Sequence, residues 1–322
     1  MTKGKNKVMT TPAGKRSDIF KKQVTPYVYL LPTIILMLIL LIIPIIMVIR
    51  YSFFDNVIIN KNPTFVGLEN FAKVLTDPTF LVAIKNTLYF VIISIIAHLV
   101  IGMFFAMLLN TRYLGNKTKG IFRVIYALPW MFTASVIAIL WKMMMNPNGI
   151  INYLLQAGGL ISQNIEWLGS RQFALFAVTL INIWSGYPFY MISILAGLQG
   201  ISTDLYEASA LDGANAVQTF TRITIPQLKP ILVSLLMLDF VWTLQQFALI
   251  WMTTGGGPIN ATETISTYIY KQGFTKYQYS MASAGAVILL VVCTIIATIK
   301  TVYGEVTYQR IVYEVNEEDG TR

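Results

Sequence analysis

One apolar stretch of the sequence carries three hydrogen-bonding side chains at helical spacing. Asp239, Thr243 and Gln246 stand at i, i+4 and i+7, so a helix over residues 231–253 would place all three on one face. A carboxylate inside a membrane-length apolar segment is costly to insert and is expected to face a wet cavity or a polar partner. The pattern favours the wall of a solute pathway, with polar contacts between packed helices as the alternative.

A second apolar stretch, residues 173–198, carries Asn182 and Gly186 at i and i+4. Pro188 follows and is expected to interrupt the helical hydrogen bonding just beyond them. Backbone groups freed at membrane depth are tolerated only against protein or a water-filled cavity. We therefore expect this segment to contribute to the same cavity.

Aromatic residues accompany these polar groups. Phe189 and Tyr190 follow the proline, and Trp130 follows Pro129 in another apolar segment. Aromatic faces beside amides and hydroxyls suit a sugar, whose C–H faces stack while its hydroxyls form hydrogen bonds. Each ring alone is typical of a core or a lipid-facing surface, so the prediction rests on the combination.

Other chemistries lack residues to carry them. The chain has one Cys and one His, which excludes disulfides and Cys-based metal or redox sites. His98 lies in an apolar run, where a buried histidine with satisfied hydrogen bonds is favoured over a proton relay. No Walker A pattern is present, so any ATP would have to be bound by another chain. We expect no enzyme activity, no cofactor and no metal.

Composition defines the class of protein. The 322 residues are 55% hydrophobic and only 12% charged, which is typical of an all-α polytopic membrane protein. A basic tail over residues 1–26 is expected to be flexible, and residues 303–322 form an acidic tail. Between the tails, the transmembrane region 27–302 contains six predicted spans, at residues 27–49, 87–109, 121–141, 173–198, 231–253 and 282–302.

The distribution of charge predicts the orientation. Six spans place both termini on one side of the membrane. The tails and loops on that side hold about twice as many Lys and Arg residues as the alternate loops, which predicts that side to be the cytoplasm. The basic residues do not form one patch, so the net charge of +9 does not indicate nucleic-acid binding.

The loop between the fourth and fifth spans, residues 203–230, is predicted to be a firm projection. Asp204 with Glu207 is a capping pattern for a first short helix. A turn at Gly213 follows that helix.

Asn215 with Gln218 offers the cap of a second short helix, which is expected to end before Pro226. The segment is too polar to span a bilayer. We expect it to rest on one membrane face.

This loop resembles the cytoplasmic loop of the membrane subunits of binding-protein-dependent ABC importers. The matching residues are Glu207-Ala208-Ser209, Asp212-Gly213-Ala214, Ile223, Pro226 and Pro230. The resemblance implies that the first two triplets dock in a cleft of a separate ATPase subunit. The alternative is an amphipathic surface helix pair without a partner.

Further phrases are similar to the larger permease subunit of maltose- and glycerol-phosphate-type importers. These are Leu128-Pro129-Trp130, the run from Asn182 to Pro188, and Thr253 to Pro258. The resemblance implies substrate contacts from Trp130, Asn182, Gly186, Phe189, Asp239, Thr243 and Gln246. Three of these, Trp130, Phe189 and Asp239, differ in type from the maltose subunit, so the substrate need not be maltose.

The resemblance implies a complete importer in a bacterial cell membrane, working by alternating access. Its other parts would be a second related permease, two ATPase subunits and an external solute-binding protein or lipoprotein. We expect the substrate to be a neutral oligosaccharide, because an unpaired Asp239 carboxylate would repel anions. The alternatives are an ABC permease for glycerol phosphate, a polyamine or a peptide, and a secondary transporter or channel working alone. The missing inverted repeat and the projecting loop argue against the last.

Overall fold

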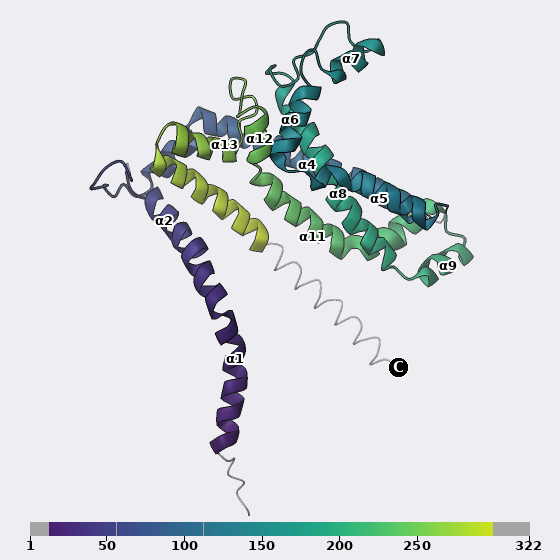
Figure 1. Cartoon of the computed structure of the whole chain (residues 1–322), viewed down its shortest axis with the longest axis horizontal. Coiled ribbons are helices and arrows are strands. Elements are labelled where there is room, and N and C mark those ends of the chain that lie inside the picture. Colours follow the sequence, from purple (N-terminus) through teal and green to yellow (C-terminus); the bar gives the residue numbers. More distant parts are fainter. Residues whose placement is uncertain (1–12, 56, 112, 299–322) are drawn as a thin grey trace, which may run out of the picture.

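The regular elements in the described part of the chain are helices, as the sequence predicts (Figure 1). The computed structural model describes residues 13–298 apart from 56 and 112, with side chains from residue 25 onward. Within this part, five helical stretches are long and apolar enough to cross a bilayer, and one bent pair of helices could be a sixth span. The five are Thr25–Ser52, Pro78–Asn110, Ala174–Gln199, Ala216–Leu244 and Tyr279–Thr298.

Helices α4 and α8 form the most extensive helix pair and, with α11, the centre of the bundle (Figure 1). Their bounds are Pro78–Asn110, Ala174–Gln199 and Ile225–Leu244. The apolar core between them includes the fully buried side chains of Tyr190, Ile194 and Leu228. Gly102 permits close approach of α4 to α8, because a β-carbon there would lie 2.4 Å from Cβ of Tyr190. Helix α8 also continues through Pro188, so the hydrogen bond that the proline cannot donate does not break the helix.

The first span is a long rod that stands apart from the bundle (Figure 1). It consists of α1 (Ala13–Met37), a π-helical turn (Leu38–Ile42) and α2 (Ile43–Ser52). No residue of its most apolar window is buried. The tail over residues 1–26 was expected to be flexible, but it is helical from Ala13. Once the helix of the first span has formed, each residue added at its end gains one backbone hydrogen bond, so the helix extends into the tail. Residues 1–12 and the acidic tail 303–322 lie outside the described part.

The predicted third span is two helices rather than one. Helices α5 (Asn116–Met131) and α6 (Ala134–Met144) meet at an angle of 96°. Phe132 and Thr133 between them are extended, and Oγ1 of Thr133 accepts a bond from the backbone N–H of Val136 at 3.5 Å. The predicted span 121–141 is bent, because Thr133 caps a new helix in another direction.

The predicted fifth span is interrupted as well. Helix α11 ends at Leu244, and α12 (Ala248–Thr253) begins after three non-helical residues. Asp239 and Thr243 therefore share a helical face, as predicted, whereas Gln246 lies in the break and not on that face.

The projecting loop contains two short helices, α9 (Thr203–Leu211) and α10 (Ala216–Thr219). Ser202 caps α9 by accepting from the N–H of Asp204, so the cap precedes the predicted one by two residues. Gly213 turns the chain at φ +74°. Asn215 and Gln218 form the predicted capping box.

The second helix of the loop does not end before Pro226. It widens into a π-helical turn, Phe220–Thr224, and continues into α11. The N–H of Ile225 bonds to the carbonyl of Phe220, five residues back. A π-turn accommodates the proline ring that follows, and the turn before Pro44 in the first span has the same register.

Short helices gather at the end of the bundle away from α9 (Figure 1). They are α3 (Glu69–Thr76), α7 (Ile150–Ala157), α13 (Ile265–Tyr270) and a π-helical turn (Lys271–Thr275). The chain between α12 and α13 is fixed to α4 by Nδ2 of Asn86, which donates to the carbonyls of Asn260 and Glu263 at 3.1 and 3.0 Å.

Candidate functional site

A cavity of about 260 Å³ lies between α4, the α5–α6 junction, α8 and the end of α11. It contains six of the seven residues that the sequence singles out for substrate contact. Its lining consists of His98, Pro129, Trp130, Phe132, Ala134, Ile137, Asn182, Ser185, Gly186, Asp239, Trp242, Thr243, Gln246 and Leu249. Both helix breaks border this cavity, so each break that the sequence failed to predict helps to shape it.

His98 of α4 is at the centre of the polar wall. Its Nδ1 lies 2.8 Å from Oδ2 of Asp239 on α11, and its Nε2 lies 3.1 Å from the backbone oxygen of Asn182 on α8. His98 and Asp239 are only 2% and 7% exposed. The predicted interpretation of His98 as a buried, satisfied histidine is confirmed, whereas the expectation of an unpaired Asp239 is wrong.

The neighbouring polar groups complete this network. Thr243 donates from Oγ1 to Oδ1 of Asp239 at 2.9 Å. Asn182 donates from Nδ2 to Oγ of Ser94 at 3.0 Å. These bonds tie α4 to α8 and α11, so Asp239 borders the cavity and also joins helices. The interhelical contact raised as the alternative is therefore present, and the wall of a solute pathway stays a prediction for this residue.

Gly186 has a steric role in this arrangement. A β-carbon at Gly186 would lie 2.4 Å from Nε2 of His98. The imidazole therefore fits between α4 and α8 only because residue 186 has no side chain.

Aromatic rings form one side of the cavity. Trp130 and Trp242 line it, and each is 51% exposed. Phe189 does not line the cavity as expected, because its ring packs against these indoles, with centroids 5.9 Å from Trp130 and 5.3 Å from Trp242. It supports the indoles rather than presenting its own face.

Sequence reasoning missed Ser94, Ser185 and Trp242, and it did not connect His98 with Asp239. One signal was available, since Ser94 and His98 stand at i and i+4 on one face of an apolar segment. The pairing between α4 and α11 joins residues 141 positions apart, and no local pattern encodes it.

The projecting loop is stiff and exposes an apolar tip. Ser209 is buried, donates to the carbonyl of Tyr206 at 2.9 Å and meets Oγ1 of Thr219 at 3.4 Å. The hydroxyls of Tyr206 and Thr224 are 3.2 Å apart, which ties α9 to the start of α11. The other residues predicted to contact the ATPase, apart from half-buried Ala214, are exposed, namely Glu207, Ala208, Asp212 and Gly213.

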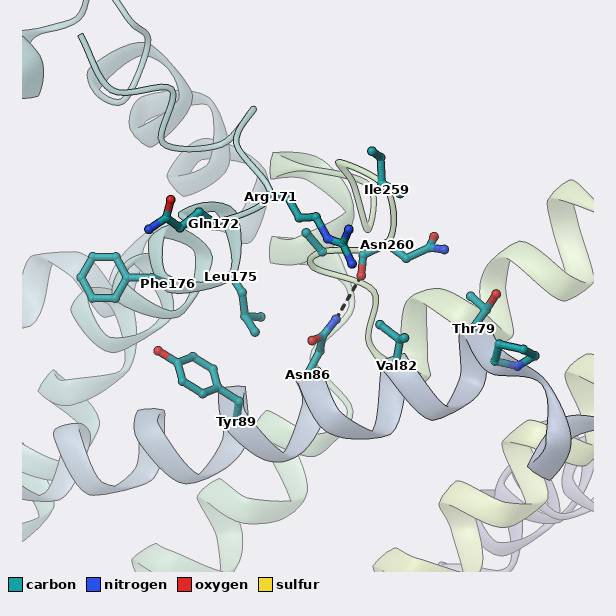
Figure 2. A pocket seen from close by; sticks show the side chains of 12 residues that line it. Thr79, Val82, Asn86, Tyr89, Arg171, Gln172, Leu175, Phe176, Ile259 and Asn260 are labelled. Atoms are coloured by element: carbon teal, nitrogen blue, oxygen red, sulfur yellow. Dashed lines mark hydrogen bonds between the residues drawn. The ribbon is translucent and has the colours of Figure 1, made fainter. Parts of the chain in front are cut away.

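A larger cavity of about 590 Å³ lies beside the N-terminal turns of α4 and α8 (Figure 2). It is enclosed by the first turns of α4 and α8 and by the segment at Asn260, and it includes Arg171, Tyr89 and Phe176. The α4 residues that line this cavity, such as Asn86 and Tyr89, lie on the side of the helix away from His98. The two cavities are therefore separate. No pattern in the sequence predicted this cavity.

The fold and site define an all-α polytopic membrane protein with a polar cavity inside its bundle and a stiff helical projection at one end. Residues 98–304 match the family described as the binding-protein-dependent transport system inner membrane component. The chain belongs to this family.

Known relatives cover most of the chain. It is 33% identical to the probable ABC transporter permease YurN of Bacillus subtilis, over 84% of this chain and 93% of the relative. It is also 33% identical to the trehalose/maltose transport permease MalF of Thermococcus litoralis, over 82% and 88% of the two chains. A crystal structure of a bacterial ABC transporter that imports the acidic polysaccharide alginate matches with a TM-score of 0.78 and 27% identity, over 90% and 98%.

The chain is therefore a multi-pass permease subunit of a binding-protein-dependent ABC importer. It is a transport component and not an enzyme. The resemblance stated from the loop motif and the intramembrane phrases is confirmed.

Proposed function

We propose that this permease imports a carbohydrate, and that the carbohydrate is an uncharged oligosaccharide. Two similar proteins are described as transporting trehalose and maltose or the polysaccharide alginate, and both substrates are carbohydrates. The cavity offers indole faces beside hydroxyl, amide and backbone groups, which is the chemistry that binds a sugar ring.

The charge of the cavity supports an uncharged substrate, but for a different reason than the sequence suggested. Asp239 is not an isolated carboxylate, so simple repulsion of anions is no longer an argument. Among the described lining residues, the only titratable side chains are His98 and Asp239, and they bind each other. The described lining contains no Arg or Lys that would compensate the charge of an anionic sugar.

The observation that carries the proposed mechanism is the continuity of the projecting loop with two cavity walls. Helix α8 carries Asn182 and Gly186, and α11 carries Asp239 and Thr243; the loop is the only chain between these helices. A displacement of the α9–α10 unit by an ATPase would therefore move both walls together. Alternating access follows if the two ATP states prefer different positions of this unit.

The proposed complex also contains a second related permease, two ATPase subunits and an external solute-binding protein or lipoprotein. The first span supports the second permease, because no residue of its most apolar window is buried by its own chain. We place α9 and both termini in the cytoplasm of a bacterial cell, on the basis of the Lys and Arg distribution.

Uptake by the reconstituted complex tests the substrate class. The chain, co-expressed with its transporter partners, would be placed in proteoliposomes and offered labelled maltotriose and labelled alginate trisaccharide. We expect ATP-dependent uptake of the neutral sugar at least tenfold faster than that of the acidic one. Preference for the acidic sugar would contradict the uncharged class, and ATP-dependent uptake of neither would contradict carbohydrate transport.

A further inference from the structure

The donors and acceptors around His98 determine where its protons are. Its Nε2 faces the backbone oxygen of Asn182 at 3.1 Å, and a carbonyl oxygen can only accept a hydrogen bond. Nε2 must therefore carry a proton, because two acceptors held together in a buried site would repel each other.

The other ring nitrogen then limits the charge of the pair. Nδ1 lies 2.8 Å from Oδ2 of Asp239, so one proton lies between these two atoms. If Nδ1 holds it, an imidazolium faces a carboxylate. If Oδ2 holds it, a neutral imidazole faces a carboxylic acid. The net charge of the pair is zero in both cases.

No other described group at the cavity alters this count. Oδ1 of Asp239 accepts from the neutral hydroxyl of Thr243, and Asn182 bonds to the hydroxyl of Ser94. Tyr190, whose ring lies 5.8 Å from that of His98, donates to the carbonyl of Leu235 and also interacts with Asp239, and its hydroxyl adds no charge. Among the residues that the structure describes, no Lys, Arg or Glu lines the cavity.

We propose that His98 determines the charge selectivity of the permease, by sharing one proton with Asp239 and so keeping the cavity free of net charge. This inference rests on the proposed site and deepens it. Loss of His98 leaves Asp239 without its neutralising partner and makes the cavity negative. Loss of Asp239 leaves a neutral imidazole that still donates from Nε2 to Asn182, so the cavity stays uncharged.

The charge can be measured without knowing the transported sugar. Cys293, the single native cysteine, lies outside this cavity and would be replaced by Ser, and Gln246→Cys would place a thiol in the cavity wall. In membranes containing the complex at pH 8, the thiol would react with the cationic trimethylammonium-ethyl and the anionic sulfonatoethyl methanethiosulfonates. The ratio of the two rates reports the local potential.

We expect H98Q to raise the cation-to-anion ratio about tenfold, the size expected for one unit charge acting with opposite sign on the two reagents over several ångströms of water. D239N and the double variant H98Q/D239N should match the parent ratio within about twofold, and the double variant controls for the loss of the ring. A fall in the ratio with D239N, or no rise with H98Q, would overturn the proposal.

Nitrogen NMR gives a second measurement that does not need H98Q to fold. His98 is the only histidine, so full-length chain labelled with ¹⁵N-histidine and purified with a histidine-free tag yields signals from one ring. We expect a protonated Nε2 in both the parent and D239N, and a change at Nδ1 alone in D239N. An unprotonated Nε2 in the parent, or a Nδ1 signal indifferent to D239N, would refute the shared proton.

Neither measurement uses a transported solute. If the reagent ratios and the NMR signals fail, the proposal for carbohydrate import stands. If sugar uptake fails while both measurements succeed, the paired proton stands.

Discussion

At the scale of residues, the cavity and the packing of the bundle depend on the same atoms. Asn182, His98 and Asp239 bond across three helices while bordering the space that a solute would occupy. Such interhelical hydrogen bonds contribute about 0.6–2 kcal/mol each in membranes. Removing one of them therefore affects folding and transport together, so a steric substitution tests the site more cleanly.

Gly186→Ala is such a substitution. Its β-carbon would lie 2.4 Å from the His98 ring, which cannot retreat without breaking its bonds to α8 and α11. We expect a loss of about 1–3 kcal/mol in stability and at least a tenfold fall in uptake, measured by thermal unfolding and proteoliposome transport.

Gly120→Ala is the matched control, since a β-carbon at Gly120 on α5 meets nothing within 4 Å. Wild-type uptake by Gly186→Ala would show that the ring does not need the space.

Glu263 gives a prediction of pH dependence outside the spans. It is fully buried, its Oε1 has no partner among the described atoms, and its Oε2 bonds to Lys271. Burial raises the pKa of Glu263, and the bond to Lys271 opposes this only in part. Because the folded-state pKa lies above the unfolded one, the contribution of Glu263 to stability is present at low pH and is lost as pH rises through the raised pKa.

Glu263→Gln removes this dependence. The melting temperature of the variant minus that of the parent should therefore increase between pH 4 and pH 8. A difference that stays constant or decreases over that range would show that the buried carboxyl is not the cause.

At the scale of elements, the α9–α10 unit links the two walls of the cavity, and its stiffness depends on one turn. Gly213 is at φ +74°, where a β-branched side chain is strongly disfavoured, although a β-carbon there meets no other atom within 4 Å. Strain and not a clash would therefore change the turn.

We predict that Gly213→Val leaves the complex assembled but uncouples ATP hydrolysis from uptake. Gly213→Asn should retain most coupling, because Asn adopts left-handed backbone more readily. The ratio of ATP hydrolysed to sugar imported checks this in proteoliposomes, with co-purification as the assembly control. Normal coupling in the valine variant would remove the turn from the mechanism.

Local sequence signals predicted the elements well where a local rule decides the structure. The Asn215–Gln218 capping box is present, and α8 covers the predicted fourth span. The bend at Thr133 and the break at Gln246 were not predicted, because apolar composition fixes a span's length and says nothing about its straightness. Pro226 was misjudged because a π-turn relieves the clash that the rule assumes.

The candidate site was predictable as a set of residues but not as a network. Helical spacing brought Asp239 together with Thr243, and Asn182 together with Gly186. The partner of Asp239 is far away in the sequence, and whether a carboxylate is paired or isolated depends on tertiary contacts. The charge of the cavity was therefore misjudged from the sequence alone.

At the scale of the whole molecule, the chain is one subunit of an ABC importer. Its projection exposes Leu211 and Val217, which are 90% and 70% exposed at the tip of a stiff loop. Apolar side chains held this way favour a partner over solvent. The apolar first span stands apart from the bundle (Figure 1), which favours a partner subunit within the membrane as well.

The most direct test of the account is photo-crosslinking at the loop tip. A photoreactive phenylalanine analogue would replace Leu211, and, as a control, Leu160, which is 74% exposed and follows α7 at the other end of the molecule. We predict that position 211 crosslinks to the ATPase subunit, with a yield that changes on ATP binding, and that position 160 does not. ATPase crosslinks at position 160, or modification of position 211 by a membrane-impermeant reagent from outside the cell, would contradict the account.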